Sequence, residues 1–387
     1  MFTKFYNENL RQLFESGHTS DARICVVGIG GGGGNAINNM VQQGINGVDF
    51  IAVNTDSQVL ASNQADYRIQ AGAETTGGLG AGARPEVGTK ALQESRDEIG
   101  RMIEPYDLVF ITAGMGGGTG TGGAPVVASI AREQGSLAVA IVTRPFACES
   151  PRRMQAAEQG IAELREQADT LLVIPNERLL DIANDRTSLM EAFRMADEVL
   201  YDATRGISDL ITYEGLVNLD FADVETTMKD GGTALLGMST EFSMHQGAGP
   251  MGKNAEGKLK IGSRAEKAAI EAISSPLFDG RSIRGAQKVL VNVTGGPSLG
   301  IREAMSATEV IQAEAGDDCE VIFGAVIDEE MEGRFQVTVI ATGLEEKKNT
   351  NRAIRIQSNE LDQLKKRNGH ANGDGATGPS FLSNAME

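Results

Sequence analysis

The chain has 387 residues, enough for two ordinary domains with buried cores, and its formal net charge is −18. An acidic chain without tryptophan, and with aromatic residues at only 5%, is poorly suited to nucleic acid and is repelled by anionic membrane surfaces. No apolar run approaches the roughly 18 residues of a membrane span, and residues 1–20 lack the apolar segment of a secretory signal. We therefore expect a cytoplasmic protein that neither binds nucleic acid nor inserts into a membrane.

The three cysteines give no sign of a disulfide framework or a metal site. Cys25, Cys148 and Cys319 are far apart in the sequence, form no CxxC pair and lack the spacing of metal ligands. We interpret them as buried free thiols in a reducing compartment.

The first half of the chain alternates apolar runs with helical segments. Strands are predicted at 22–29, 48–53, 108–113, 137–142 and 170–174. Helices are predicted after Gly34, over 87–102, and to about Glu133 with Pro125 in the first turn. This alternation indicates an α/β fold with a doubly wound, mostly parallel sheet.

The pattern changes at Ser188, where apolar residues begin to recur every three or four positions as far as Thr212. That spacing predicts one long central helix with a single apolar face. Beyond a predicted surface loop at 239–262, strands at 289–293, 321–326 and 335–341 alternate with helices at 264–273 and 301–314. We expect a smaller C-terminal α/β domain there, and a polar, disordered tail at 345–387.

Two glycine-rich segments each follow a predicted strand and precede a helix. They are Gly28-x-Gly30-x-x-Gly33 and Gly116-Gly-Gly-Thr-Gly-Thr-Gly122. Glycines let backbone N–H groups at a helix N-terminus approach a phosphate closely, and Thr119 and Thr121 can add hydroxyl donors. Because parallel strands end at the same sheet edge, the two loops predict a mono- or triphosphate nucleotide in the crevice there.

The first loop alone is also compatible with a tight strand-to-helix turn, or with the fingerprint of an NAD-dependent oxidoreductase in which Asp56 is the acidic partner. An oxidoreductase leaves the second loop unexplained. The histidines, His18, His245 and His370, lie in predicted tails or loops, so no acid or base for hydride transfer is evident. No P-loop sequence and no loop lysine is present, so phosphate charge falls to backbone dipoles, Mg²⁺ and Arg153.

The order of the motifs resembles FtsZ within the tubulin/FtsZ family, over roughly residues 21–344. The motifs that carry this resemblance lie at 30–35, 54–56, 116–122, 143–146, 174–176 and 218–223. The resemblance implies an N-terminal extension (1–20), a GTP-binding domain (21–187), a central helix (188–213), a C-terminal GTPase-activating domain (214–344) and the tail (345–387).

The resemblance also implies a cytoskeletal GTPase of cell division that polymerises head to tail and binds GTP or GDP together with Mg²⁺. It assigns roles to thirteen residues. Those expected at the phosphates are Gly31, Gly32, Gly33, Gly34, Asn35, Gly118, Thr119, Gly120 and, on the phosphate side, Arg153. Glu149 is expected at the ribose, and Asn176, Phe193 and Asp197 in the guanine pocket, where a carboxylate accepting two N–H bonds selects guanine. For Phe193, packing in the core is an equally good interpretation.

Catalysis between subunits is a hypothesis from helix length. Asp197 lies near the start of the long helix, whereas Asp220 and Asp223 follow its end, and 24 helical residues span about 36 Å. One subunit cannot bring these two carboxylates to its own γ-phosphate, but head-to-tail stacking can bring them to a neighbour's. Asp220 and Asp223, with Asn218 and Mg²⁺, would then orient the attacking water.

The chain departs from the family pattern at several positions. Cys148 replaces an aromatic residue and Ser150-Pro151 replaces a Gly-basic pair, so the ribose loop is expected to differ in shape. Of the tail peptide that binds membrane adaptors, only Pro379-Ser-Phe-Leu382 remains, followed by Ser383, which puts adaptor binding in question. A tubulin-like scaffold for cell shape is the remaining alternative to a protein of the division site.

Overall fold

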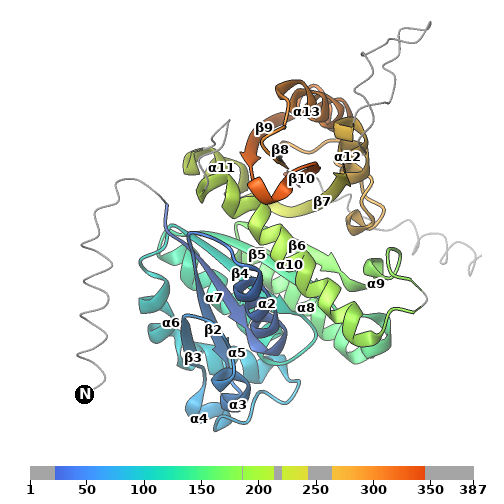
Figure 1. Ribbon diagram of the computed structural model, residues 1–387. Helices are drawn as coiled ribbons and strands as arrows, with labels where there is room; N and C mark the ends of the chain where they lie inside the picture. Colours follow the sequence, from blue (N-terminus) through green and yellow to red (C-terminus); the bar gives the residue numbers. More distant parts are fainter. Residues whose placement is uncertain (1–21, 185, 213–219, 243–263, 345–387) are drawn as a thin grey trace, which may run out of the picture. The chain divides into compact units, whose positions relative to one another are not determined.

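The computed structural model describes residues 22–184, 186–212, 220–242 and 264–344 (Figure 1). The predicted N-terminal extension and tail lie outside these ranges, as does the predicted loop beyond residue 242.

Ten described strands form one sheet in the order β3-β2-β1-β4-β5-β6-β7-β10-β8-β9. The strands are β1 (Ile24–Ile29), β2 (Val48–Asn54), β3 (Tyr67–Gln70), β4 (Leu108–Gly114), β5 (Leu137–Arg144), β6 (Thr170–Pro175), β7 (Gly232–Phe242), β8 (Lys288–Gly295), β9 (Glu320–Ile327) and β10 (Arg334–Thr342). Neighbours are parallel from β3 to β7 and between β8 and β9, whereas β10 is antiparallel to β7 and β8. The predicted mostly parallel α/β fold is therefore confirmed.

Helices connect these strands. They are α2 (Gly30–Gln43), α3 (Ser57–Ala61), α4 (Ala73–Thr76), α5 (Pro85–Glu94), α6 (Arg96–Ile103), α7 (Thr119–Glu133), η1 (Ala147–Glu149), α8 (Pro151–Gln167), α9 (Asn176–Leu179), α10 (Leu189–Thr212), α11 (Phe221–Met228), α12 (Arg264–Ile273), η2 (Pro276–Phe278), α13 (Ile301–Ala315) and η3 (Glu329–Met331). None of these described helices is both long and apolar enough to cross a membrane.

The sheet is buried on both faces, which explains why its central strands are apolar without interruption. In β1, Ile24 and Val26 pack with α2 and α10, whereas Cys25 and Val27 face the core shared with α6, α7 and α8. Successive strand residues point to opposite faces, so a doubly covered strand needs apolar residues at every position. A third core gathers Phe278, Phe335 and their neighbours between α12, α13 and strands β7 to β10.

The long helix α10 crosses one face of the sheet. Its apolar stripe, which includes Ala196, Leu200, Ala203 and Ile207, packs into the core shared with α2. Figure 1 shows α9 and α11 near opposite ends of this helix. Thr212, at its end, lies beside Gly47, the residue before β2 begins. The predicted long central helix is thus confirmed.

Several predicted elements differ in the structure. The predicted helix at 87–102 is two helices that are interrupted at Ser95, whose hydroxyl accepts a hydrogen bond from Gly72 N. Helix α7 begins at Thr119, so Pro125 lies inside the helix and not in its first turn. The last four residues of the glycine–threonine segment, 119–122, form the first turn, and Pro125 removes only one hydrogen bond. Strands β3 and β7 were not predicted.

The cysteine prediction is only partly correct. Cys25 and Cys319 are buried free thiols, whereas Cys148 is exposed on η1. Burial raises the pKa of the Cys25 thiol, which keeps that group protonated.

Helices α5 and α7 touch through glycine. A Cβ atom on Gly122 would lie 2.0 Å from the Pro85 carbonyl oxygen and 2.7 Å from Thr89 N. The Thr89 hydroxyl donates to the Gly122 carbonyl at 3.0 Å, which fixes the approach. A side chain at position 122 would therefore separate two backbones that have no flexible atoms to yield. Gly117, five residues earlier, faces open space.

We predict opposite stability effects for alanine at these two positions. Gly122→Ala should lower the free energy of unfolding by about 1–3 kcal/mol, because overpacking forces the backbones apart. Gly117→Ala should leave it unchanged or raise it by up to about 1 kcal/mol, because the unfolded chain loses freedom at no steric cost. Chemical denaturation of both variants measures the difference, and equal destabilisation would contradict this account of the packing.

Candidate functional site

The carboxyl ends of three neighbouring strands lie together at one edge of the sheet. Strand β1 is paired on both sides, and its last residue, Ile29, is in register with Val53 of β2 and Ala113 of β4. The segments that follow these strands therefore start side by side. They are the two glycine loops and the Asn54-Thr55-Asp56 turn.

The glycines of the first loop have two different tasks. Gly28 and Gly33 allow α2 to pack closely against the strands. A Cβ on Gly33 would lie only 2.4 Å from the Thr112 carbonyl oxygen of β4. Gly31 is exposed, and a Cβ there would meet nothing within 4 Å. No packing requirement of the described chain explains glycine at position 31, so the space above it is available to a ligand.

The second loop divides in the same way. Gly117 faces open space, whereas a Cβ on Gly120 would lie 2.9 Å from the Gly114 carbonyl oxygen. Thr121 is buried and its hydroxyl accepts from Gly116 N at 2.8 Å, so it supports the loop from within. The expectation that Thr121 offers a donor to a ligand is therefore not met. Thr119 remains partly exposed.

The two loops lie against each other. A Cβ on Gly30 would be 2.9 Å from Gly120 N and 3.2 Å from the Thr119 Cβ. The hydroxyls of Thr55 and Thr119 are 2.6 Å apart, which ties the turn after β2 to the second loop. Helices α2 and α7 thus begin next to one another, and two positive helix ends face the same space. This arrangement is suited to a phosphate chain.

Glu149 and Arg153 flank the loops and pair with each other. Arg153 Nη1 donates to Glu149 Oε2 at 2.7 Å, and Phe146 N donates to Glu149 Oε1 at 2.9 Å. Ser150, between them, has φ 128° and ψ 152°, a conformation that normally needs glycine and is strained for serine. The departure noted at Ser150 therefore coincides with an unusual backbone at this loop.

A buried polar residue and a pair of aromatic residues lie near the carboxyl ends of β6 and β5. Asn176 directly follows β6, is 4% exposed, and its Oδ1 has no hydrogen-bond partner. Phe193 is 40% exposed and meets Phe146 edge to face, with ring centroids 5.3 Å apart. Phe193 is therefore not a core residue. An unpartnered buried acceptor beside an exposed aromatic ring fits a planar ligand with N–H donors.

Asp197 lies one helical turn after Phe193 on α10. Burial raises the pKa of this carboxyl to about 6, from an ordinary value of 3.8. Desolvation disfavours the charged form, and a ligand that donates to the carboxylate would favour it again. A partly buried carboxyl with a raised pKa is typical of a functional site.

The predicted catalytic residues lie far from this edge. Asp220 caps α11, since its Oδ1 accepts from Asp223 N at 3.0 Å, and both residues are exposed. At its other end, α11 accepts a hydrogen bond at the Met228 carbonyl from Thr170, the first residue of β6. Asn176 follows the last residue of β6, whereas α11 bonds to the first. Helix α11 therefore lies at the amino end of β6, opposite the edge where the glycine loops lie. Asn218 lies outside the described residues.

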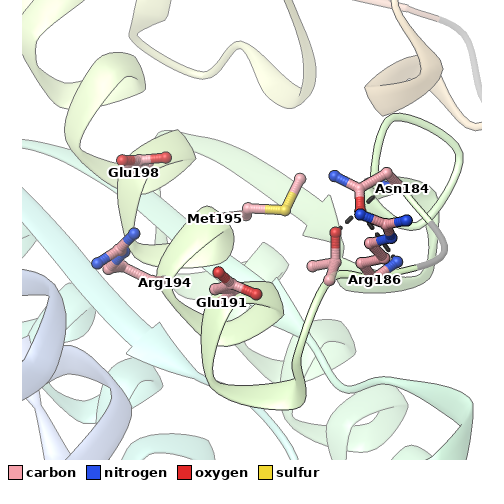
Figure 2. A pocket seen from close by; sticks show the side chains of 7 residues that line it. Asn184, Arg186, Glu191, Arg194, Met195 and Glu198 are labelled. Carbon is pink, nitrogen blue, oxygen red and sulfur yellow. Dashed lines mark hydrogen bonds between the residues drawn. The ribbon is translucent and has the colours of Figure 1, made fainter.

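A cavity of about 410 Å³ lies on another side of α10, and its lining side chains are drawn in Figure 2. Glu191, Arg194 and Glu198 line it from the helix, and Asn184 and Arg186 from the segment before it. Residues 193 and 197 fall on a different side of the helix. None of the lining residues is buried, and they carry both charges. The cavity is therefore separate from Phe193 and Asp197.

Two residues at the edge received no role from the sequence. Thr55 contacts Thr119, and Phe146 supports both Phe193 and Glu149. Both belong to motifs at strand ends, and position at a strand end was the signal that could have identified them. Among the described residues, no three His, Cys, Asp or Glu side chains gather into a metal site.

Known proteins resemble the chain over both halves. The model of the Tubulin/FtsZ family GTPase domain matches residues 23–184, and that of the FtsZ family C-terminal domain matches residues 251–345. An empty FtsZ dimer from M. jannaschii is 39% identical to this chain, with a TM-score of 0.76. The match covers 88% of this chain and 92% of the M. jannaschii chain.

Two structures from Haloferax volcanii share the fold at lower identity. The GDP-bound monomer of CetZ1 is 21% identical, with 88% of this chain and 99% of that chain covered and a TM-score of 0.68. A GTPγS-bound protofilament of CetZ2 is 22% identical, with coverages of 89% and 99% and a TM-score of 0.65. The two family models and the 39% identity to an FtsZ together show that the chain belongs to the Tubulin/FtsZ family.

Proposed function

We propose that the chain binds GTP and GDP at the carboxyl edge of its sheet, assembles head to tail, and hydrolyses GTP where subunits meet. The observation that carries this proposal is the contact of the two glycine loops, where Gly30 lies against Thr119 and Gly120. The match to a GTPase-domain model over residues 23–184 supports it. The oxidoreductase alternative is not favoured, because it accounts for one loop only.

The phosphates would lie against the backbone N–H groups of the two loops. We assign them to Gly31, Gly32, Gly33, Gly34 and Asn35 of the first loop, and to Gly118, Thr119 and Gly120 of the second. Arg153, which is 49% exposed, can reach the phosphate side, and Glu149 would accept from the ribose. Mg²⁺ would be bound largely by the phosphates, as is usual in nucleotide sites, because the described residues offer no cage for it.

The guanine base would enter the pocket of Asn176, Phe193 and Asp197. Asp197 as a carboxylate accepts two N–H bonds from guanine, which adenine cannot supply in that geometry. The unpartnered Asn176 Oδ1 can accept a further N–H, and the exposed Phe193 ring contacts the base plane.

Hydrolysis would need the neighbouring subunit. Asp220 and Asp223 lie at the amino edge of the sheet, beyond a 24-residue helix that spans about 36 Å. In a head-to-tail stack this edge meets the neighbour's carboxyl edge. There Asp220 and Asp223 would orient and polarise the water that attacks the γ-phosphate, and we assign Asn218 to the same group.

An exposed apolar surface at the carboxyl edge supports self-association. Leu180, Ile182, Leu189 and Met190 are exposed around α9 and the start of α10, with Met190 82% exposed. Exposed apolar patches of this kind mark contact sites between proteins. The M. jannaschii FtsZ structure is a dimer and the CetZ2 structure a protofilament, which agrees with this reading.

The cellular role would be that of a cytoplasmic filament at the division site. The higher identity to an FtsZ than to the CetZ proteins supports division over a scaffold for cell shape. Loss of division in cells depleted of the chain would distinguish the two roles. Adaptor binding through residues 379–382 stays a prediction, because the tail lies outside the described residues.

Hydrolysis measured against protein concentration tests the proposed function. With GTP and Mg²⁺, specific activity should rise above a threshold concentration, and light scattering should appear in GTP and not in GDP. Turnover strictly proportional to protein from the lowest concentration would mean that each subunit is self-sufficient.

Asp223→Ala should leave GTP binding unchanged and reduce turnover by about 100-fold or more, because the attacking water loses a positioning group. Asp230→Asn, which alters another exposed carboxylate just after α11, is the control and should turn over normally. Undiminished phosphate release by Asp223→Ala would remove Asp223 from the mechanism.

GDP affinity should fall by about tenfold between pH 7 and pH 5, because Asp197, with a pKa of about 6, must be ionised to accept from guanine. Burial also raises the pKa of Asp202 to about 6, so Asp197→Asn is needed to identify the group. That variant should bind weakly, and this part of its pH dependence should vanish.

In the absence of nucleotide, protonation relieves the desolvated Asp197 charge. The contribution of Asp197 to the free energy of unfolding therefore increases as pH falls from about 6 toward 3.8.

Met190→Glu should raise the protein concentration needed for assembly at least about tenfold, because a charge would be buried in the apolar contact. GTP binding by the monomer should persist, since the side chain is exposed there. Gln159→Glu on the outer surface of α8 adds the same charge and is the control. Assembly of Met190→Glu at the wild-type threshold, measured by sedimentation, would exclude this surface from the contact.

A further inference from the structure

Helix α9 carries Asn176 but cannot hold its own position. It contains four residues, Asn176–Leu179, and a single turn has no stability by itself. Leu179 is buried in the core, whereas Glu177 and Arg178 are exposed and make directed contacts outward. The position of Asn176 relative to a base therefore depends on the groups that bind the Glu177 and Arg178 side chains.

The two charged side chains of α9 bind two different supports. Glu177 Oε2 accepts from Ala147 N at 2.8 Å, which joins α9 to the loop that carries Glu149. Arg178 Nε donates to Asp279 Oδ1 at 2.8 Å. Asp279 belongs to the C-terminal part of the chain, 101 residues further on. Its second oxygen faces Arg144, at the end of β5, at 3.9 Å.

Asp279 stands on a fixed support. It follows η2, whose Leu277 and Phe278 are buried, and its own N–H bonds to the Pro276 carbonyl at 3.0 Å. Its backbone is left-handed, with φ 52° and ψ 43°, which directs the side chain away from the helical turn. The carboxylate is thus held by the C-terminal core and presented to Arg178 of α9 and Arg144 at the end of β5.

We propose that Asp279 is a positioning residue for the base pocket: through Arg178 it holds α9, and with it Asn176, against the nucleotide. This inference rests on the proposed GTP site. The C-terminal part of the chain then contributes to nucleotide affinity within its own subunit, in addition to the catalytic contribution of Asp220 and Asp223 to the next. A displacement of η2 would be transmitted to the base pocket by one ion pair.

The effect should be moderate, because the pair is partly exposed, at 44% for Arg178 and 35% for Asp279. Pairs of this kind are worth up to about 1 kcal/mol, which corresponds to a factor of about two to five in affinity. Asp279→Asn is the suitable variant, since asparagine also tolerates the left-handed backbone and keeps the side-chain shape.

The test is a double-mutant cycle on GDP binding at protein concentrations below the assembly threshold. Fluorescent GDP is titrated into the wild-type chain, Asp279→Asn, Arg178→Gln and the double variant. Glu314→Gln, which removes the partner of Arg284 elsewhere in the C-terminal part, is the matched control. Melting temperatures of the nucleotide-free proteins are recorded in parallel.

The proposal predicts a two- to fivefold weaker GDP affinity for each single variant, no further loss in the double variant, and a melting temperature like that of Glu314→Gln. Wild-type affinity of Asp279→Asn, or single effects that multiply in the double variant, would overturn it. A drop in melting temperature that accounts for the affinity loss would also overturn it, because the role would then be structural. If the wild-type chain binds no GDP, the proposed function itself is wrong.

Discussion

The close contact of two backbone loops is the constraint on which the rest of the site depends. Gly30 can lie against Thr119 and Gly120 because Gly30 and Gly120 carry no side chain at the contact, and because β1 pairs directly with β4. The same approach starts α2 and α7 side by side and adds their dipoles in one place. An acidic chain with no lysine in either loop can bind an anion this way, because local N–H groups outweigh the distant charge of the surface.

The length of α10 separates the residues proposed for base binding from those proposed for catalysis. The helix carries Phe193 and Asp197 near one edge of the sheet and ends beside Gly47 at the other, just before the segment that leads to Asp220. The proposed base pocket and the two acidic residues therefore lie at opposite ends of the sheet within one subunit. In the proposed function, assembly would bring the acidic residues of one subunit to the nucleotide of the next, and turnover would depend on that contact.

Much of the fold could be predicted because its signals are local. Strands β1, β4 and β5 are buried on both faces and so are apolar throughout, and α10 repeats its apolar stripe over 24 residues. The errors arise where contacts formed only on folding matter. Ser95, at the interruption between α5 and α6, accepts from Gly72, Thr121 turns inward to Gly116, and β7 pairs with β6 and β10. In the site, the residue types were predictable, but the pairing of Glu149 with Arg153 and the support of α9 by Asp279 required coordinates.

The central claim is that the active site is shared between subunits, and complementation tests it most directly. Asp223→Ala, which should bind GTP without hydrolysing it, is mixed with Gly31→Asp, whose added carboxylate should exclude phosphate without a clash, since position 31 faces open space. Neither variant alone should hydrolyse GTP. The account predicts that the mixture does, because the GTP of one subunit meets the intact Asp223 of the other. A mixture as inactive as its components, although the two variants co-assemble, would contradict the shared site.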